Sequence, residues 1–251
     1  MFLQPLCFIL NFVINTLNES HLHRTLKRFY AEQIEGSQTE IKVGKYICDI
    51  VCPGKEIIEI QTTSLGHLLT KIMFFIQQKY KIKVVYPLPV IKYIETKDLS
   101  ANKISKRKSP LSKTIYKGLF RELTALYPIL LNKNFTLEVI EISYTEERIK
   151  ESQLKQSQNN LRRFKKNWNK TGKRLESIGQ SHVFHRKKSY IKLLPQDLPE
   201  NFTAKEIYSL LKKQGIKTDM QNVRLLCWLF SHMELFKISG KKEKAYMYKI
   251  T

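Results

Sequence analysis

The sequence predicts an α/β chain (α+β in its layering), with a mixed-sheet core of order αβββαβ followed by a small C-terminal unit of helices and a β-hairpin. Three observations favour this class. Apolar residues recur at helical spacing in two early segments, short β-type runs separated by turn residues lie between them, and capping residues open two further helices near the C-terminus. With 251 residues, 42% of them hydrophobic, the chain can bury one good core or a medium domain with a small one.

The N-terminal part supplies the αβββαβ order. Asn18 is the expected N-cap of a helix that runs to about Ile34 and carries Leu22, Leu26 and Phe29 on one apolar stripe. The elements expected next are strands at Thr39–Val43, Tyr46–Val51 and Glu56–Gln61, a helix at Leu65–Lys79, a buried strand at Lys81–Pro87 and an extended piece at Val90–Glu95. Gly44 and the pair Pro53-Gly54 provide the turns between the three short strands.

The middle of the chain is less regular. We expect a basic loop at Lys103–Lys113, a helix at Ile115–Tyr127 and a strand at Phe135–Ser143. The stretch from Glu146 to about Asn169 is polar and increasingly basic, and it predicts either a helix or a basic connector.

The C-terminal unit has the order of a winged helix. Thr203 and Glu206 form a capping box before one helix, Gly215 ends that helix, and Thr218 or Asp219 caps a second. A hairpin follows over Leu235–Ser239 and Ala245–Ile250, with a basic tip at Gly240-Lys241-Lys242. Helix, turn, helix and hairpin is the order of winged-helix domains, which bind DNA or other proteins.

The chain therefore divides into an apolar N-terminal segment (1–17), a core domain (18–147), a basic connector (148–192) and a winged-helix domain (193–251). The net charge of +22 is unevenly spread over these parts. Residues 148–192 hold 14 basic and 2 acidic groups, a net charge of +12, whereas residues 1–102 hold 12 and 9, a net charge of +3. An excess of this size predicts a polyanionic partner, for which we expect DNA, duplex or branched.

The compartment follows from the cysteines and the N-terminus. Four scattered cysteines do not form a secreted disulfide framework, so we expect buried thiols in a cytoplasmic protein. Met1–Ile14 is apolar but too short to span a bilayer, and without a basic start or a cleavage site it is a poor signal peptide. A buried segment, or a start codon assigned upstream of the true one, is favoured, and no membrane partner is expected.

Chemistry is expected at Asp49, Glu59 and Gln61. Glu59 and Gln61 share one face of their strand, because strand side chains alternate. A two-residue Pro53-Gly54 turn pairs Asp49 with Ile58, on the wrong face, whereas a three-residue loop pairs Asp49 with Glu59. Two such carboxylates side by side attract a divalent cation, for which Mg²⁺ or Mn²⁺ is expected. The spacing is loose, so a solvated Asp49 and a lysine-paired Glu59 remain an open alternative.

An Asp on the second strand and Glu-x-Gln on the third, in the order αβββαβ, resemble the PD-(D/E)XK nuclease superfamily over residues 18–95. The resemblance implies a restriction-endonuclease-like fold, with Asp49 and Glu59 as metal ligands. The third position is usually Lys, and Gln61 stands there instead, a departure that is also found in some members. Lys71 on the next helix either supplies the positively charged side chain that Gln61 lacks or is a charged residue of the surface. Glu19 fits the superfamily's Glu on the first helix, Glu40 is a weaker choice, and a helix-dipole role is the alternative for Glu19.

The chain also resembles a family of uncharacterised prokaryotic proteins. The segments that carry this resemblance include Gly44-Lys45-Tyr46, Ile58 to Thr62, Val85-Tyr86-Pro87, Arg107-Lys108-Ser109-Pro110 and Tyr246-Met247-Tyr248. The resemblance spans most of the chain and implies the two-part architecture, but no activity.

Nucleic acid is expected to contact three basic groups. The first interleaves cations with aromatics, Phe164 and Trp168 being placed either to stack on bases or to pack on the core domain. The expected contacts are Arg162, Arg163, Lys165 and Lys166; Arg186, Lys187 and Lys188; and, in the winged helix, Asn222, Arg224, Lys241 and Lys242. The sequence thus predicts a Mg²⁺-dependent endonuclease-like phosphodiester hydrolase. Its expected catalytic residues are Asp49, Glu59, Gln61, Glu19 and Lys71. Whether the protein forms a homodimer is left open. The alternative is a catalytically inactive DNA-binding protein or regulator of the same fold.

Overall fold

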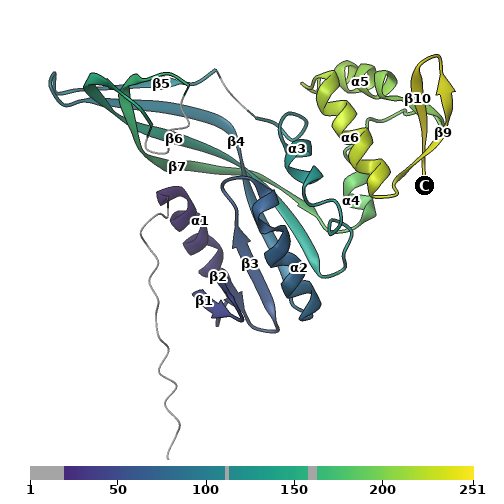
Figure 1. The fold of residues 1–251 in the computed structure, drawn as a ribbon, viewed down its shortest axis with the longest axis horizontal. Helices are drawn as coiled ribbons and strands as arrows, with labels where there is room; N and C mark the ends of the chain where they lie inside the picture. The colour runs from purple at the N-terminus through teal and green to yellow at the C-terminus, as the bar shows by residue number, and fades with distance from the viewer. Residues whose placement is uncertain (1–19, 111–112, 158–162) are drawn as a thin grey trace, which may run out of the picture.

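The computed structural model describes residues 20–110, 113–157 and 163–251. A large mixed sheet has the strand order β1-β2-β3-β4-β6-β7, and β5 pairs with β4 (Figure 1). The first strands are β1 (Gln38–Val43), β2 (Tyr46–Cys52) and β3 (Glu56–Ile60), which form an antiparallel meander, and β4 (Lys81–Asp98) lies parallel to β3. The expected class, a mixed sheet covered by a few helices, is confirmed.

Two helices cover the two faces of the meander. On α1 (His21–Ala31), Leu22, Leu26 and Tyr30 pack in a cluster with Ile58 of β3. The 3-10 turn η1 (Leu65–Leu68) leads into α2 (Leu69–Gln77), which packs in the other cluster with Ile57. Neighbouring residues of β3 therefore enter opposite clusters, as strand alternation requires. Helix α1 begins later than expected. Its N-cap is Ser20, whose Oγ accepts a hydrogen bond from His23 N. Asn18 lies outside the described residues.

The loop between β2 and β3 has three residues, Pro53–Lys55. Ile50 lies opposite Ile58, and Cys52 lies opposite Glu56. Continued by one step, this register would set Asp49 opposite Glu59, but the pairing ends at Ile50 and Ile58. The tight reversal has left-handed backbone at Gly54 (φ +75°) and at Lys55 (φ +59°).

Lys55 is therefore in a conformation that costs a side-chain-bearing residue about 1–2 kcal/mol. Glycine adopts it freely but loses more backbone entropy on folding, about 0.5–1 kcal/mol. We expect Lys55→Gly to raise the free energy of unfolding in urea by about 0.5–1 kcal/mol. Lys45→Gly is the matched control, because Lys45 has no left-handed backbone. Lys45→Gly should lower the free energy of unfolding. A Lys55→Gly variant that also lowers it would contradict the claim that the backbone of Lys55 is strained.

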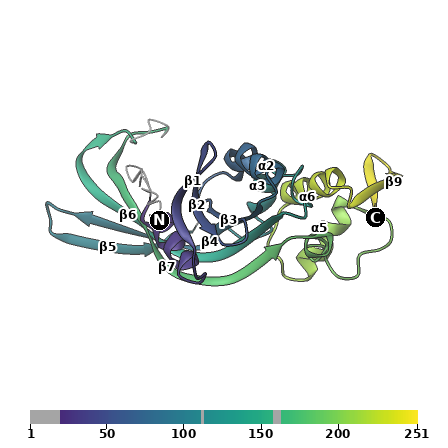
Figure 2. The ribbon, with the colours of Figure 1, turned by 90° about the horizontal axis from the view of Figure 1, so that it is seen from below.

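Beyond the meander the sheet extends into an arm. The arm consists of β5 (Lys103–Lys108), residues 90–98 of β4, residues 143–155 of β6 (Phe135–Lys155) and residues 166–177 of β7 (Lys166–Phe184). Figure 2 shows that this part of the sheet is strongly curved. Four expectations are corrected here. Lys81–Pro87 and Val90–Glu95 belong to one strand, Lys103–Lys108 is a strand rather than a loop, and the helix expected at 115–127 is shortened to α3 (Leu119–Thr124).

The fourth correction concerns the connector. Most of residues 148–192 lie in β6 and β7, so this stretch is part of the sheet, and the expected helix is wrong. Charged pairs take the place of apolar ones there: Arg174 bridges Glu95 and Glu147, and the Arg148 guanidinium stacks 3.5 Å from the centre of the Trp168 ring. Without apolar alternation, the sequence gives no strand signal in this region.

The C-terminal unit consists of α4 (Lys187–Ile191), β8 (Phe202–Thr203), α5 (Ala204–Lys213), α6 (Met220–His232), β9 (Phe236–Lys242) and β10 (Ala245–Ile250). The strands form a second sheet of order β8-β10-β9. The expected capping box is present, since Thr203 Oγ1 accepts from Glu206 N and Glu206 accepts from Thr203 N. The hairpin tip is at Glu243-Lys244, so Lys241 and Lys242 lie on β9.

The C-terminal unit shares its core with the large sheet. Leu123 of α3 and Leu226 of α6 belong to one buried cluster, and the Tyr190 hydroxyl of α4 donates to Leu130 O. The boundary expected at residue 193 therefore falls inside this unit. In the described part of the chain no helix is long and apolar enough to cross a membrane, and Cys48, Cys52 and Cys227 are buried free thiols.

Candidate functional site

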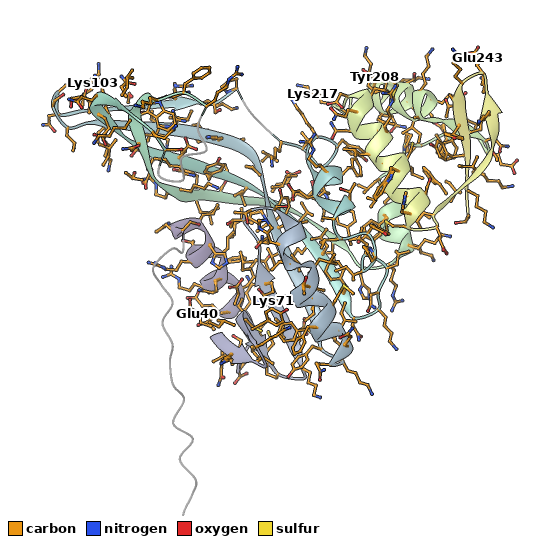
Figure 3. The ribbon with its side chains drawn as sticks, in the orientation of Figure 1. Glu40, Lys71, Lys103, Tyr208, Lys217 and Glu243 are labelled. Atoms are coloured by element: carbon orange, nitrogen blue, oxygen red, sulfur yellow. The ribbon has the colours of Figure 1, made fainter. Side chains whose placement is uncertain are left out.

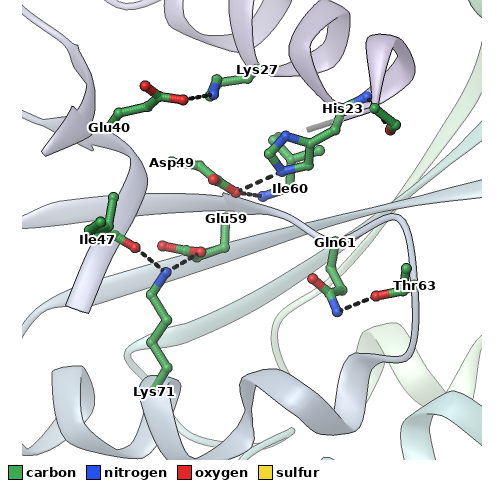
Figure 4. Close-up of polar contacts among 11 residues, drawn as sticks. His23, Lys27, Glu40, Ile47, Asp49, Glu59, Ile60, Gln61, Thr63 and Lys71 are labelled. Atoms are coloured by element: carbon green, nitrogen blue, oxygen red, sulfur yellow. Dashed lines mark hydrogen bonds and ion pairs between the residues drawn. The ribbon is translucent and has the colours of Figure 1, made fainter. Parts of the chain in front are cut away.

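Asp49 lies where β2 and β3 separate. Its Oδ2 accepts hydrogen bonds from the backbone N–H of Ile60 at 2.7 Å and makes a contact of 3.2 Å with His23 Nε2 (Figure 4). The Ile60 N–H, on the last residue of β3, thus bonds to a β2 side chain instead of a β2 carbonyl, and the paired register stops at Ile50 and Ile58. The Asp49 carboxylate therefore occupies the gap between the two strands, with α1 supplying the histidine.

Glu59 is buried on β3 beside this gap, with 3% of its surface exposed. Lys71 of α2 donates from Nζ to Glu59 Oε2 at 2.6 Å and to the carbonyl of Ile47 at 2.6 Å (Figure 4). Within the described residues, Glu59 Oε1 is a buried oxygen without a hydrogen-bond partner. A carboxylate placed in this way has one oxygen neutralised by a lysine and one available to a further ligand.

The electrostatics reflect how closely these groups lie. Burial and, second to it, the negative charge of Asp49 raise the pKa of Glu59, Lys71 opposes both, and the resulting pKa is about 7. Burial also raises the pKa of the Cys48 thiol to about 12, with the Glu59 charge as the second cause. Asp49, Glu59, Lys71 and Cys48 therefore form one interacting set across β2, β3 and α2.

Gln61 turns away from the carboxylates. Its Nε2 donates to Thr63 Oγ1 at 2.9 Å and to the carbonyl of Ser64 at 2.6 Å, and its backbone N–H donates to Val85 O at 2.9 Å. These bonds hold the chain as it leaves β3 for η1. The amide group of Gln61, at which chemistry was expected, is thus engaged in a local turn in this arrangement.

Of the two acidic candidates on the N-terminal side, Glu40 does not join the site, because it pairs with Lys27 at 2.6 Å. Glu19 lies outside the described residues. From α1, His23 makes the contact with Asp49. The sequence contains no signal for this role of His23 beyond its position on the first helix.

The expected nucleic-acid contacts in the described chain lie on or next to β7, α4, α6 and β9, so they are spread along the ribbon on which Figure 3 draws the side chains. Arg163, Lys165 and Lys166 lie at the distal end of the arm, and Arg162 lies outside the described residues. Arg186, Lys187 and Lys188 lie at the start of α4, where Lys187 Nζ bonds to Thr251. In the C-terminal unit Arg224 is exposed, whereas Asn222 bonds to the cap residue Asp219, Lys242 pairs with Glu206, and Lys241 lies over the Tyr246 ring. Phe164, for which two roles were open, is 63% exposed and does not pack on the core.

Fold and site together define an α+β protein with two carboxylates and a lysine where β2 and β3 separate. The chain belongs to the family described as "Domain of unknown function (DUF8091)", whose model matches residues 20–185. That match covers the whole large sheet and ends before α4. An "Uncharacterized protein" of Treponema pallidum (strain Nichols) is 31% identical over 194 residues, which are 77% of this chain and 73% of that protein. No solved structure gives a significant match.

Proposed function

We propose that this protein is a metal-dependent, endonuclease-like phosphodiester hydrolase that acts on DNA. The observation that carries the proposal is the placement of the Asp49 carboxylate between β2 and β3, beside the buried Glu59 with its unpartnered oxygen. The element order α1-β1-β2-β3-α2-β4, with β3 parallel to β4, supports a restriction-endonuclease-like core of the PD-(D/E)XK type. The coarse fold does not fix function, so the proposal rests on the site.

The residues present fit a magnesium or manganese ion. Mg²⁺ is commonly held by one or two carboxylates, with water and substrate phosphates as its remaining ligands. Asp49 and Glu59 would hold it, and the orphaned Glu59 oxygen is the donor that the fold leaves without another partner. No group of three or more His, Cys, Asp or Glu suited to a metal is present among the described residues, so water and substrate phosphates would supply the remaining ligands. Such an ion supplies an activated water and neutralises charge on the phosphate.

The protein's own groups position and balance this chemistry. His23 holds the Asp49 carboxylate in the gap between the strands, and Lys71 holds that of Glu59. The Lys71 ammonium takes the place in the site that a lysine two residues after Glu59 would otherwise fill. In this proposal it stabilises the negative charge that develops on the phosphate, an electrostatic role that a neutral glutamine cannot perform.

The C-terminal unit would hold the DNA as a winged helix. Its order α4-β8-α5-α6-β9-β10 and its sheet order support that assignment. Arg224 on the exposed side of α6, with Lys241 and Lys242 on β9, is placed to contact duplex or branched DNA through phosphates. Asn222 contributes less in this arrangement, because its amide group bonds to Asp219.

A second candidate function is a catalytically inactive DNA-binding protein or regulator. One observation favours it: Lys71 already neutralises Glu59 without a metal, while Gln61 is bonded to Thr63 and Ser64. In that reading the Glu59–Lys71 pair only joins β3 to α2.

The two functions are separated by one pair of assays on the full chain. Supercoiled plasmid, a branched duplex and a labelled single strand are incubated with Mg²⁺ or Mn²⁺, and with EDTA as the control. Binding to the same substrates in EDTA is measured in parallel at several salt concentrations. Metal-dependent cleavage of any of them supports the hydrolase. Salt-sensitive binding without cleavage under either metal overturns it in favour of the DNA-binding protein.

A further inference from the structure

A hollow of about 180 Å³ opens beside the candidate site. It begins at Thr62, the residue after Gln61, and continues between α1, β4, β6 and β7. The residues that line it are Leu22, Thr62, Tyr86, Pro87, Pro89, Lys113, Ile142, Tyr144 and Lys173. Most of these side chains are apolar, so the two lysines are the charged groups with which it can bind a ligand.

Further cations surround the hollow. Lys92, Arg148 and Lys170 lie next to Lys173 on the same face of the arm, and with Lys113 we call these five residues the hollow cations. The cations Lys92 and Lys173 both approach the Tyr144 ring, at 5.9 and 5.7 Å from its centre. Glu146 pairs with Lys92 at 2.8 Å and with Arg148 at 2.5 Å. Within the described part of the chain, Lys113, Lys170 and Lys173 have no carboxylate at ion-pair distance.

On the opposite face of the arm, one cluster of cations is compensated by carboxylates. There Arg174 contacts Glu95, Glu147 and Glu176, and Lys106 lies 3.4 Å from Glu176. In that cluster two cations face three carboxylates, with Lys97 and Lys108 on the same face of the arm, whereas at the hollow five cations surround one carboxylate. A local excess of cations around a hollow indicates an anionic ligand rather than general solubility.

Of the uncompensated cations, Lys173 is half-buried, whereas the side chains of Lys113 and Lys170 are exposed. Partial desolvation lowers the pKa of Lys170, and it lowers that of Lys173, for which Lys170 is the second cause. The surroundings of both lysines therefore disfavour their charged form. A local cost of this kind is typical of a functional site.

We propose that the hollow cations bind the phosphates of a single nucleic-acid strand and guide it to Asp49 and Glu59. The cations form a row and not a point, because Lys173 lies opposite Glu146 and Lys170 lies opposite Arg148 along the paired strands β6 and β7. A row suits consecutive phosphates better than one small anion. Trp168, stacked on Arg148, ends the row with an aromatic ring. The proposal rests on the proposed function in two respects: it takes nucleic acid as the polyanion, and Asp49 and Glu59 as the site to which the strand is guided.

The test uses a labelled single-stranded oligonucleotide, with anisotropy measured on the full chain in EDTA. K170Q/K173Q is expected to weaken binding at least tenfold, and to reduce the slope of log affinity against log salt by about 1.4, since each charge contributes about 0.7 on single strands. K106Q/K108Q removes the same charge from the same arm and should change affinity less than twofold. K170R/K173R, which keeps the charge, should bind like the wild type.

Four outcomes decide the matter. Equal losses in K170Q/K173Q and K106Q/K108Q would overturn the proposal, because overall charge would then explain them, and unchanged binding of K170Q/K173Q would overturn it too. Displacement of the oligonucleotide by millimolar inorganic phosphate at constant ionic strength would assign the hollow to a small phosphorylated molecule instead. K170Q/K173Q should melt at the same or a higher temperature than the wild type, and a lower one would contradict the stability cost. Because no metal is present, wild-type binding without any cleavage would count against the hydrolase alone.

Discussion

Replacing Glu59 with glutamine is expected to reduce metal-dependent DNA cleavage by about a thousandfold or more. Such a loss corresponds to about 4 kcal/mol of transition-state stabilisation, in keeping with the removal of a metal ligand. Glutamine keeps the size of the side chain and removes the negative charge that a divalent cation requires. The measurement is the initial rate of plasmid or oligonucleotide cleavage at saturating Mn²⁺.

Glu56→Gln is the matched control, because Glu56 is on the same strand three residues earlier, at the end that carries the hairpin loop. It should cleave at the wild-type rate within about threefold, which corresponds to less than 1 kcal/mol. Residual Glu59→Gln activity equal to that of Glu56→Gln would exclude Glu59 as a ligand. Both variants should show wild-type circular dichroism, so that a loss of activity is not a loss of folding.

Replacing Lys71 with methionine is expected to lower the free energy of unfolding by about 3 kcal/mol. The Lys71 and Glu59 side chains are only 14% and 4% exposed, so the substitution leaves a buried carboxylate without its cation. Chemical denaturation in urea without metal measures the effect. The double variant Lys71→Met/Glu59→Gln should recover most of the loss, because neither charge then remains.

Lys83→Met is the control for a more exposed pair. Lys83 lies 3.8 Å from Glu138 and is 31% exposed, so its loss should cost less than about 1 kcal/mol. If Lys71→Met costs no more than Lys83→Met, the Glu59 carboxylate is better solvated than the structure indicates. If the double variant is no more stable than Lys71→Met alone, the loss comes from packing rather than from an unpaired charge.

The core of the fold could be predicted because its signals are local. Alternating apolar residues identify the strands, Gly44 and Gly54 mark the turns, and Thr203 with Glu206 caps a helix. The expectation that Asp49 and Glu59 lie near each other depended on one choice, the length of the loop after Cys52. The sequence left that choice open, because Lys55 gives no sign that it adopts a left-handed conformation.

The arm and the environment of the site could not be predicted, for a physical reason. The strands of the arm are stabilised by ion pairs and stacking across the sheet, such as those of Arg174 and Arg148, and these pairs join residues far apart in the chain. The same applies to His23, whose partner Asp49 is 26 positions away. Lys170 and Lys173 were counted in the basic connector, but only the sheet register shows that they lie on the face of Glu146 and not on that of Glu95 and Glu147.

The central claim, that Asp49 and Glu59 hold a divalent cation, is tested most directly by the anomalous scattering of Mn²⁺ in crystals of the full chain. We predict one strong anomalous peak within coordinating distance of a carboxylate oxygen of both Asp49 and Glu59, and no such peak in crystals of the Glu59→Gln variant. An anomalous peak at another place would contradict the claim. So would the absence of any peak at saturating Mn²⁺ while Lys71 remains bonded to Glu59.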